Sequence, residues 1–521
     1  MAISALLPLF LNLCGQVQGE QGLKPTAKSE QASHPLLARN PAGEMVSVAV
    51  GPSGKNIDPS VRLTGLTFEI GGDLPLEDIE ELILAGSENA KEFNQSTRLH
   101  SGVKPSHLCT FSIDCPLGGG ARFWLAGRLK GGANIDHRVS ARCTLVSTTQ
   151  GDVLPTVKAQ GPQRLGVALR RAGEGGVHTH RIPALATTPK GNLLCVYDLR
   201  HRSGRDLQGD IDIGLSRSTD GGRTWENPRV IMDMGQHGSL PEEQNGCSDP
   251  GIIVDPKTGE IFVFAVWMNG KPGKHQWNGD GSEAGYEVGK AAQMLVVRSS
   301  DEGTTWSKPE NLTRQLKQEA WVLLAPSPQQ GISLRDGTLV MPIQGRDEKG
   351  VPFATIMTSQ DHGRTWKVGT PAYSGGNECQ AALLSDGRIM LNMRNDLSRF
   401  RAVSVTGDLG KTWTQHPTHS SALIEPNCNA SLIAVPRPSG KRALLFSNPH
   451  TQATRTRQTI QVSLDDGMTW PEAGHVLLDA GKGSGYSSMS LIDSDHVGIV
   501  YEGSQAQLVF QRIDLREIIE K

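Results

Sequence analysis

This 521-residue chain has almost no excess of either charge, few cysteines that lie close together in the sequence, and few long hydrophobic runs. Its 52 Lys and Arg residues nearly balance 54 Asp and Glu residues, which leaves a formal net charge of −2. Because nucleic-acid binding depends on a basic surface, no nucleic-acid partner is expected. Residues 3–13 form an apolar run too short to span a bilayer, and no other segment is apolar enough to cross one. No membrane span is therefore expected.

The few cysteines do not form a recognisable site. Eight Cys residues are scattered singly, without the paired spacing of zinc sites. His178 and His180 lie close together, but no third ligand accompanies them, so we interpret them as loop or packing residues. We expect chemistry without a metal or a cofactor. Cys109, Cys115 and Cys143 are near enough in the sequence for one disulfide, which the sequence leaves open.

The N-terminal residues 1–22 are typical of a secretory signal peptide. Their apolar stretch is followed by small residues for cleavage at Val17-Gln-Gly19. Cys14 leaves lipid attachment open as an alternative. Residues 23–45 have no periodicity and are predicted to be a flexible tether. We therefore expect an exported protein that is secreted, periplasmic or held at the cell surface.

Glycine, in contrast, is abundant, with 60 residues beside 30 Pro, as a turn-rich all-β protein requires. Between residues 46 and 157, short alternating runs such as residues 63–70 and 121–126 are separated by Gly-rich turns. This pattern predicts a small β-sandwich domain. Whether this carbohydrate-binding-like domain binds sugar or only packs beside the next domain stays open.

Five copies of one octapeptide, Ser/Thr-x-Asp-x-Gly-x-Thr-Trp, organise the rest of the chain. They recur at intervals of 47 to 81 residues, which is typical of propellers and arrays. Each copy follows a short alternating run, so it is predicted to be a hairpin turn. Its Asp can accept backbone N–H bonds, its Gly supplies a positive φ, and its Trp packs between neighbouring sheets. The copies, here called Asp boxes, are 218–225, 299–306, 359–366, 406–413 and 463–470.

Residues 164–521 are predicted to be a six-bladed β-propeller. First strands near residues 183, 251, 331, 381, 431 and 488 mark six repeats of a four-strand unit. The last unit lacks an Asp box and a fourth strand. Residues 164–169 can supply that strand and close the ring, which removes an exposed sheet edge. The fold class is therefore all-β, with a sandwich followed by a propeller.

Polar residues gather on one face of the predicted propeller. The Asp boxes lie on one face, called the Asp-box face. The starts of first strands, the ends of second strands and the second-to-third loops lie on the opposite face, called the site face. Eight charged or phenolic residues occupy those positions: Arg181, Arg200, Asp206, Asp249, Glu378, Arg394, Arg455 and Tyr486. The sequence therefore predicts a functional site on this face.

The residue types indicate the chemistry. Arginines repel one another unless an anion joins them, so the cluster of Arg181, Arg394 and Arg455 favours a carboxylate-bearing substrate. A Tyr beside a Glu can act as a nucleophile, and the assigned pair is Tyr486 with Glu378. General acid and then general base is the role expected of Asp206 in its loop.

Two assignments have competitors. Arg457 lies two residues after Arg455, but Arg455 is preferred because Arg457 directly abuts a strand. Gln344 ends a second strand on the site face and is a weaker candidate for contacts to the substrate.

In this order, Arg181-Ile-Pro, the five Asp boxes, Glu378, Arg394, Arg455 and Tyr486 resemble the exo-α-sialidases (neuraminidases) of bacterial and animal type. The resemblance runs from about residue 166 to the C-terminus. The preceding sandwich resembles the extra domain of gut-bacterial members of glycoside hydrolase family 33. The resemblance to this family implies retaining hydrolysis of terminal sialic acids on glycans, glycoproteins or glycolipids.

The resemblance also implies roles. By position, the triad that binds the sialate carboxylate is matched by Arg181, Arg394 and Arg455. Tyr486 matches the nucleophile, Glu378 matches its base, and Asp206 matches the general acid/base. Arg200 matches an additional pocket arginine and Asp249 an acidic residue near the O4 and N-acetyl edge of the sugar. Transfer to another sugar, formation of an anhydro-sugar, or a non-catalytic sialoglycan-binding propeller are the alternatives. The presence of all three catalytic residues disfavours the last.

Overall fold

The computed structural model describes residues 25–52, 60–117, 120–158, 160–237, 240–269, 274–275 and 281–520. The expected signal peptide, with Cys14, lies outside these residues, and the expectation of export stays a prediction. Within the described ranges the α-helices are α1 (Thr313–Leu316) and α2 (Arg516–Ile519), and no helix is long and apolar enough to cross a membrane. The remaining regular structure is almost entirely strand.

The N-terminal region folds into two sheets that enclose a common apolar core. The larger sheet has the order β11-β1-β3-β8-β5-β6, and the smaller has β9-β4-β7 with β10 on β9. Phe68 of the smaller sheet and Phe123 of the larger one are both fully buried in this core. The strands are β1 (Pro25–Gln31), β3 (Gly43–Pro52), β4 (Arg62–Gly72), β5 (Ile79–Ser87), β6 (Thr97–Val103), β7 (Leu108–Pro116), β8 (Ala121–Leu129), β9 (Arg138–Thr148), β10 (Gly151–Val153) and β11 (Thr156–Lys158).

The predicted tether is wrong for its described part, residues 25–45. Strand β1 pairs antiparallel with β3 and parallel with β11, and its residues alternate between buried and exposed. Strand β2 (Leu36–Ala38) pairs parallel with β12 (Gln163–Arg170). These partners include strands more than a hundred residues away, so the polar local sequence gave no sign of the pairing. The sandwich therefore includes residues that were assigned to a linker.

The disulfide that the sequence left open is not formed. All seven cysteines within the described ranges are free thiols. Cys109 on β7 and Cys143 on β9 both pair with Phe68 on β4, so one strand separates them. Two strand spacings amount to about 9–10 Å, which is beyond the reach of a disulfide.

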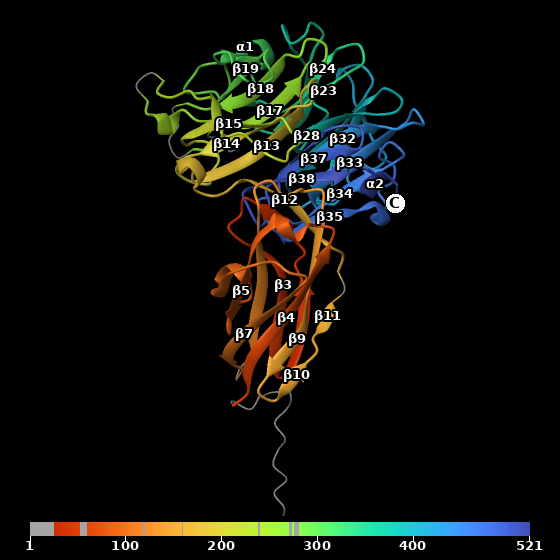
Figure 1. The fold of residues 1–521 in the computed structure, drawn as a ribbon. Helices are drawn as coiled ribbons and strands as arrows, with labels where there is room; N and C mark the ends of the chain where they lie inside the picture. The colour runs from red at the N-terminus through yellow and green to blue at the C-terminus, as the bar shows by residue number, and fades with distance from the viewer. Residues whose placement is uncertain are drawn as a thin grey trace, which may run out of the picture.

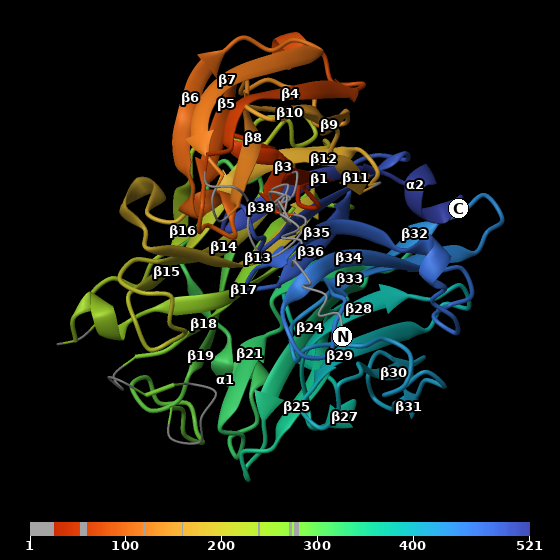
Figure 2. The ribbon, with the colours of Figure 1, turned by 90° about the horizontal axis from the view of Figure 1, so that it is seen from below.

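In the described part of the chain, six sheets surround a common centre (Figure 2). The first four blades comprise β13 (Thr179–Thr187), β14 (Leu193–Arg200), β15 (Ile211–Ser218) and β16 (Arg229–Met232); β17 (Cys247–Val254), β18 (Ile261–Trp267), β19 (Gln293–Ser299) and β20 (Glu310–Asn311); β21 (Leu323–Pro326), β23 (Ile332–Ser333), β24 (Leu339–Arg346), β25 (Pro352–Ser359), β26 (Lys367–Val368) and β27 (Tyr373–Ser374); and β28 (Gly376–Leu383), β29 (Ile389–Asn395), β30 (Ala402–Thr406) and β31 (Thr414–Gln415). The last two comprise β32 (Ser431–Pro436), β33 (Arg442–Pro449), β34 (Thr456–Ser463) and β35 (Val476–Lys482); and β36 (Ser487–Leu491), β37 (His496–Tyr501) and β38 (Leu508–Asp514) with β12.

Strand β12 closes the ring, as predicted. It pairs antiparallel with β38, where Val167 lies opposite Phe510. Its first residues also pair with β9 of the sandwich, where Gln163 lies opposite Val139. Figure 1 shows β12 at the junction between the sandwich lobe and the propeller. One strand thus completes the sixth blade and joins the two domains.

The first strand of the third blade differs from its prediction. It begins at Leu323 rather than near residue 331, and it is split into β21 and β23, which both pair with β24. Pro326 and Pro328 lie at the break, and proline cannot donate a ladder hydrogen bond. Between them and β23, β22 (Gln329–Gln330) pairs instead with β17 of the preceding blade.

The Asp boxes are hairpin turns between third and fourth strands, as predicted. In the first box, the Asp220 carboxylate accepts the backbone N–H of Thr224 at 2.9 and 3.0 Å. Gly222 has a φ of 91°, and a Cβ there would lie 2.1 Å from the ring of Phe510. Trp225 packs edge-on against the same ring, 5.1 Å between centroids, and Phe510 belongs to the neighbouring blade. The box is therefore a device that shapes a turn and packs blades together.

Candidate active site

Three of the predicted site residues lie where a first strand breaks its register. The pairing of first and second strands shifts just after Arg181, around Asp249 and around Glu378. Ile182 and Asp249 have φ values of 58° and 59°, a region that side chains other than glycine seldom adopt. Such irregularities bend a strand and redirect its side chains. Here they occur at the same end of three blades, which brings the side chains to one place.

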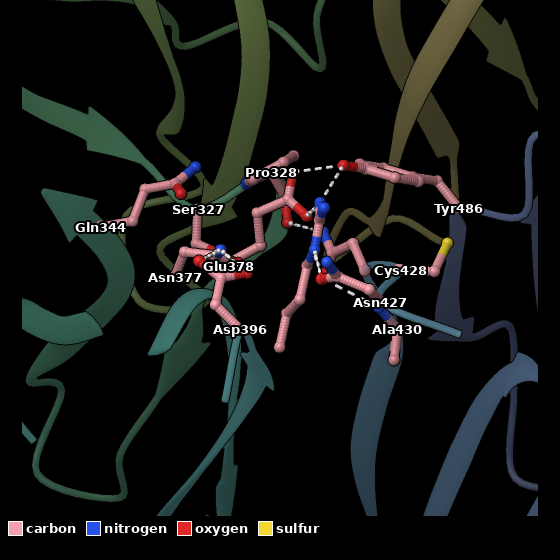
Figure 3. A network of polar contacts seen from close by, with 12 residues as sticks. Ser327, Pro328, Gln344, Asn377, Glu378, Asp396, Asn427, Cys428, Ala430 and Tyr486 are labelled. Carbon is pink, nitrogen blue, oxygen red and sulfur yellow. Dashed lines mark hydrogen bonds and ion pairs between the residues drawn. The ribbon is translucent and has the colours of Figure 1, made fainter. Parts of the chain in front are cut away.

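The centre of the site is a hydrogen-bonded Tyr–Glu pair (Figure 3). The Tyr486 hydroxyl donates to Glu378, although 108 residues separate them. Arg394 Nη1 lies 2.8 Å from Glu378 Oε2 and 3.1 Å from the Tyr486 oxygen, and Arg394 Nε donates to Asn427. Both members of the pair are only 6% exposed. A phenol, a carboxylate and a guanidinium therefore share one network.

Burial and the Glu378 charge raise the pKa of Tyr486 well above its usual value, although Arg394 and Arg455 oppose the shift. The phenol is therefore neutral in the resting site. It can become a nucleophile only when its proton passes to Glu378 during attack.

Arg181 is held by a residue that the sequence reasoning missed, Glu502. The carboxylate accepts Arg181 Nε at 2.9 Å and Nη2 at 3.1 Å. It also accepts the backbone N–H groups of Ile182 and Tyr486, at 2.9 and 3.0 Å. Glu502 directly follows β37, the second strand of the last blade. Arg200 has a similar position, because it is the last residue of β14, the second strand of the first blade. The rule that selected Arg200 could have found it.

Arg455, and not Arg457, joins the cluster. Its guanidinium carbon lies 5.6 Å from the centre of the Tyr486 ring, and Arg181 lies 5.2 Å from the same ring. Arg455 is fixed by the carbonyls of Ser484 and Asn427, at 2.8 and 3.0 Å. Arg457 instead lines a different cavity, beside the sandwich. Arg181, Arg394 and Arg455 thus surround one phenol.

Asp206 lies in the loop after β14, opposite the Tyr–Glu pair. Its carboxylate lies 2.6 Å from Arg200 and 3.7 Å from Arg181, and its second oxygen is 3.3 Å from His275 Nε2. Burial favours the neutral acid, but His275 and the two arginines outweigh it and hold the pKa of Asp206 well below its usual range. Asp206 is therefore ionised before a substrate binds.

Asp249 and Arg200 meet at a second missed residue, Asp198. Arg200 donates to Asp198 at 2.8 and 3.1 Å, and the backbone N–H of Asp249 donates to it at 3.0 Å. Burial first, and then the charges of Asp198 and Glu378, raise the pKa of Asp249 well above its usual value. Its Oδ2 atom is buried without a hydrogen-bond partner among the described residues. Asp249 can therefore offer a protonated carboxyl to a ligand hydroxyl.

Part of this cluster lines one pocket of about 250 Å³, whose lining does not include Arg181, Arg200 or Arg455. Its wall includes Tyr486, Glu378, Arg394, Asp206 and Asp249. That volume suits one compact sugar-sized ligand better than an extended chain. Further lining residues that the sequence reasoning left weak or unnamed are Gln344, Arg346, Asn377, Asp396 and His275.

Of the two early histidines, His180 is buried beside the site and His178 is exposed. His180 is buried against Tyr197, with ring centroids 5.9 Å apart, and it contacts Gln507. Burial lowers the pKa of His180 to about 4, so it is neutral near pH 7. His178 contacts Thr179.

Comparisons with known proteins show the family to which the chain is similar. Residues 191–500 match the family described as BNR repeat-like domain. A sialidase of Bacteroides fragilis is 43% identical over 403 residues, which cover 76% of this chain and 74% of the relative. A sialidase of Micromonospora viridifaciens is 35% identical over 342 residues, or 63% of this chain and half of the relative.

A solved structure extends the likeness to the N-terminal domain. The Hadza microbial sialidase Hz136 is 37% identical and superposes with a TM-score of 0.88 over 94% of this chain and all of its own. The blades, the Asp boxes and the Tyr–Glu pair among arginines are thus found in a chain whose relatives are sialidases over most of its length. This protein belongs to the sialidase family of glycoside hydrolases.

Proposed function

We propose that the protein is an exo-α-sialidase that hydrolyses terminal α-linked sialic acids from glycoconjugates with retention, through a covalent bond to Tyr486. The observation that carries the proposal is the hydrogen bond from the buried Tyr486 hydroxyl to Glu378 within a cluster of arginines. Most retaining glycosidases use a carboxylate nucleophile, and sialidases with Tyr are an exception.

The chemistry of the substrate explains this exception. Sialic acid carries a carboxylate on its anomeric carbon, so an Asp or Glu nucleophile would meet a like charge. A phenol that stays neutral until it attacks avoids this repulsion, and the raised pKa of Tyr486 fits that requirement. In this proposal Arg181, Arg394 and Arg455 bind the substrate carboxylate, since a guanidinium matches a carboxylate with two N–H groups.

In the first step the Tyr486 oxygen bonds to the anomeric carbon, and its proton passes to Glu378. The bond from that carbon to the leaving sugar breaks, and Asp206 supplies a proton to the departing oxygen. In the second step Asp206 takes a proton from water, which attacks the anomeric carbon. The Tyr486 oxygen leaves and recovers its proton from Glu378. Each step moves one proton at each end, so charge is balanced throughout.

Asp206 must gain a proton before the first step, although its pKa is low in the resting protein. The substrate carboxylate brings a negative charge beside Arg181, one of the groups that lower this pKa. Its arrival also excludes water from the pocket. Both changes favour the protonated acid. Substrate binding therefore raises the pKa of Asp206 and favours the protonated form that acts as the general acid.

Two measurements test the proposal. Proton NMR of a freshly mixed α-sialoside should show the α-anomer of free sialic acid first, and the β-anomer first would contradict retention. A 3-fluoro sialic acid analogue, which slows the second step, should add its mass to the peptide that contains Tyr486. An anhydro-sugar product would indicate attack by the substrate's own hydroxyl, and a sialylated acceptor would indicate transfer. Absence of any product would favour the binding-propeller alternative.

A further inference from the structure

A second hollow lies on the Asp-box face, where the first strands of the blades end. Strand β28 carries Glu378 near its start and ends at Leu383, so about 16 Å of strand separates the active site from this hollow. Two adjoining cavities of about 530 and 600 Å³ form the hollow, and both are lined by Leu334, Arg335, Leu383 and Arg442. All six blades contribute to the larger cavity. The proposed reaction uses none of these residues.

The rim of the hollow carries four cations that form no ion pair. Arg335, Arg437, Lys441 and Arg442 line the smaller cavity, and none of the four has a salt bridge to another described residue. Desolvation, and then the charge of Arg335, lower the pKa of Arg442, against the opposing effect of Asp466. Two arginines that repel each other across a cavity are stabilised when an anion binds between them.

The two acids in the lining of the smaller cavity are bonded within their own turns. The Asp336 carboxylate accepts the backbone N–H of Thr338 at 2.9 Å. The Asp386 carboxylate accepts Arg388 Nε at 2.7 Å, and Arg388 is not part of the lining. Four cations and two acids therefore leave two positive charges in excess around this cavity.

The floor beside the cations is apolar. Five half-buried side chains from four blades line it, namely Ile332, Leu334, Leu383, Ala434 and Leu491. An apolar floor next to guanidinium groups without a counter-ion matches a ligand that has an acidic group on an apolar body.

Hydrogen bonds between blades fix the shape of the hollow. The backbone N–H of Arg442 donates to the Ser385 hydroxyl of the preceding blade at 3.0 Å, and that hydroxyl donates to Asp466 at 2.8 Å. Lys257 of the second blade donates to the carbonyl of Asp336 in the third, at 2.7 Å. These contacts preorganise the hollow, which lowers the entropy lost on binding.

We propose that this hollow is a second, non-catalytic binding site for an amphiphilic anion, a molecule with a carboxylate or sulfate group on an apolar body. The acidic group binds between Arg335 and Arg442, and the apolar body lies over Leu334 and Leu383. These four residues line both cavities, so one ligand can contact all of them. The site is independent of the activity proposed for the opposite face.

A fluorescent probe of this chemistry tests the site. Anilinonaphthalene sulfonate joins a sulfonate to aromatic rings, and its emission rises in an apolar environment. Its titration into the full chain should show saturable binding. Arg335→Gln and Arg442→Gln should each raise the Kd about five- to ten-fold, because each removes one charge-assisted contact. An unchanged Kd in both variants would overturn the site.

Two control variants locate the probe. Arg364→Gln, at an exposed Asp-box arginine outside both cavities, should leave the Kd unchanged. Arg455→Gln, on the site face, should leave it unchanged too, and a loss of probe binding there would place the ligand in the active site and contradict the proposal. Thermal unfolding shows whether each variant is folded. Arg335 is exposed, so Arg335→Gln keeps the test decisive even if Arg442→Gln is less stable.

Competition separates the acidic group from the apolar body. Octyl sulfate below its micelle concentration should displace the probe. Octyl glucoside has the same chain without the charge, and sodium sulfate has the anion without the chain, so each should compete at least about ten-fold less well. Equal competition by octyl glucoside would contradict the role of the arginines, and equal competition by sodium sulfate would contradict the role of the apolar floor. Tighter competition by sodium octanoate than by octyl sulfate would assign a carboxylate as the acidic group, and the reverse order would assign a sulfate.

Discussion

The two faces of the propeller use the same strands for opposite purposes. On the Asp-box face, five blades repeat nearly one turn, and each Asp accepts hydrogen bonds from residues within four positions of it. On the site face, every blade contributes a different residue, and the central contact joins Tyr486 to Glu378 across 108 positions. A turn that recurs from blade to blade can be encoded by a repeated sequence. A single asymmetric substrate instead requires a different side chain from each blade.

The electrostatics of the two faces differ in the same way. Hydrogen bonds within the box lower the pKa of Asp301, Asp361 and Asp408 to about 2. On the site face, burial and the charge of Glu378 from another blade move the pKa of Tyr486 upward, against the opposing effect of Arg394 and Arg455. Local bonds thus determine one set of ionisations, and long-range assembly determines the other. Substitutions on the two faces should separate activity from stability.

The largest effect is expected from Tyr486→Phe, which removes only the phenolic oxygen. We expect kcat to fall at least about 10³-fold with the unfolding temperature nearly unchanged, because the nucleophile is lost but the ring still packs. Steady-state kinetics and thermal unfolding measure both. Tyr373→Phe, at a half-buried ring outside the pocket, should behave as wild type. Wild-type turnover by Tyr486→Phe would remove Tyr486 from the mechanism.

On the Asp-box face, Trp366→Ala should have the opposite effect to Tyr486→Phe and lower stability rather than activity. Trp366 is 2% exposed and packs edge-on against Phe262 and Phe264 of the preceding blade. Its loss should cost about 3–5 kcal/mol of the free energy of unfolding, as large core truncations do. Activity per folded molecule should persist. Trp413→Ala, at a half-buried box tryptophan, should cost less in a denaturant titration. Equal costs would contradict burial as the cause.

Glu502→Gln tests the support of the arginine cluster. The amide keeps the shape but loses the charge opposite Arg181, so Arg181 is held less firmly for the substrate carboxylate. We expect kcat/KM to fall roughly 10- to 100-fold, largely through KM. Partial restoration of activity in Glu502→Asp would support a role for the negative charge opposite Arg181. An unchanged KM in Glu502→Gln would show that Glu502 is not needed to position Arg181.

The smallest effect concerns acid stability. The pKa of Asp301 is about 2 in the folded protein, below its ordinary value of 3.8. A depressed pKa means that the ionised group stabilises the fold above pH 3.8, and that this contribution is lost as the pH falls through about 2. Asp301→Asn should therefore unfold at a lower temperature than wild type at pH 5, and the difference should shrink at pH 2. A difference independent of pH would exclude ionisation as its source.

Residues with a local signature could be predicted from the sequence. The Asp boxes, the number of blades and the closing strand β12 follow from turn chemistry and strand alternation. Asp198 was missed because a buried acid next to an arginine has no local sequence pattern, whereas the position of Glu502 at the end of a second strand could have been noticed. The strand β1 was assigned to a tether because its partners β3 and β11 lie elsewhere in the chain.

The sequence by itself determined a repeated turn, its spacing, and which residues stand at the ends of strands. Those features depend on backbone geometry and on neighbours a few residues away. Only the tertiary structure decided that Tyr486 meets Glu378, that Glu502 holds Arg181, and that β12 joins the propeller to the sandwich. The physical reason is that closure of the ring sets distances between residues hundreds of positions apart, and burial there determines their charge.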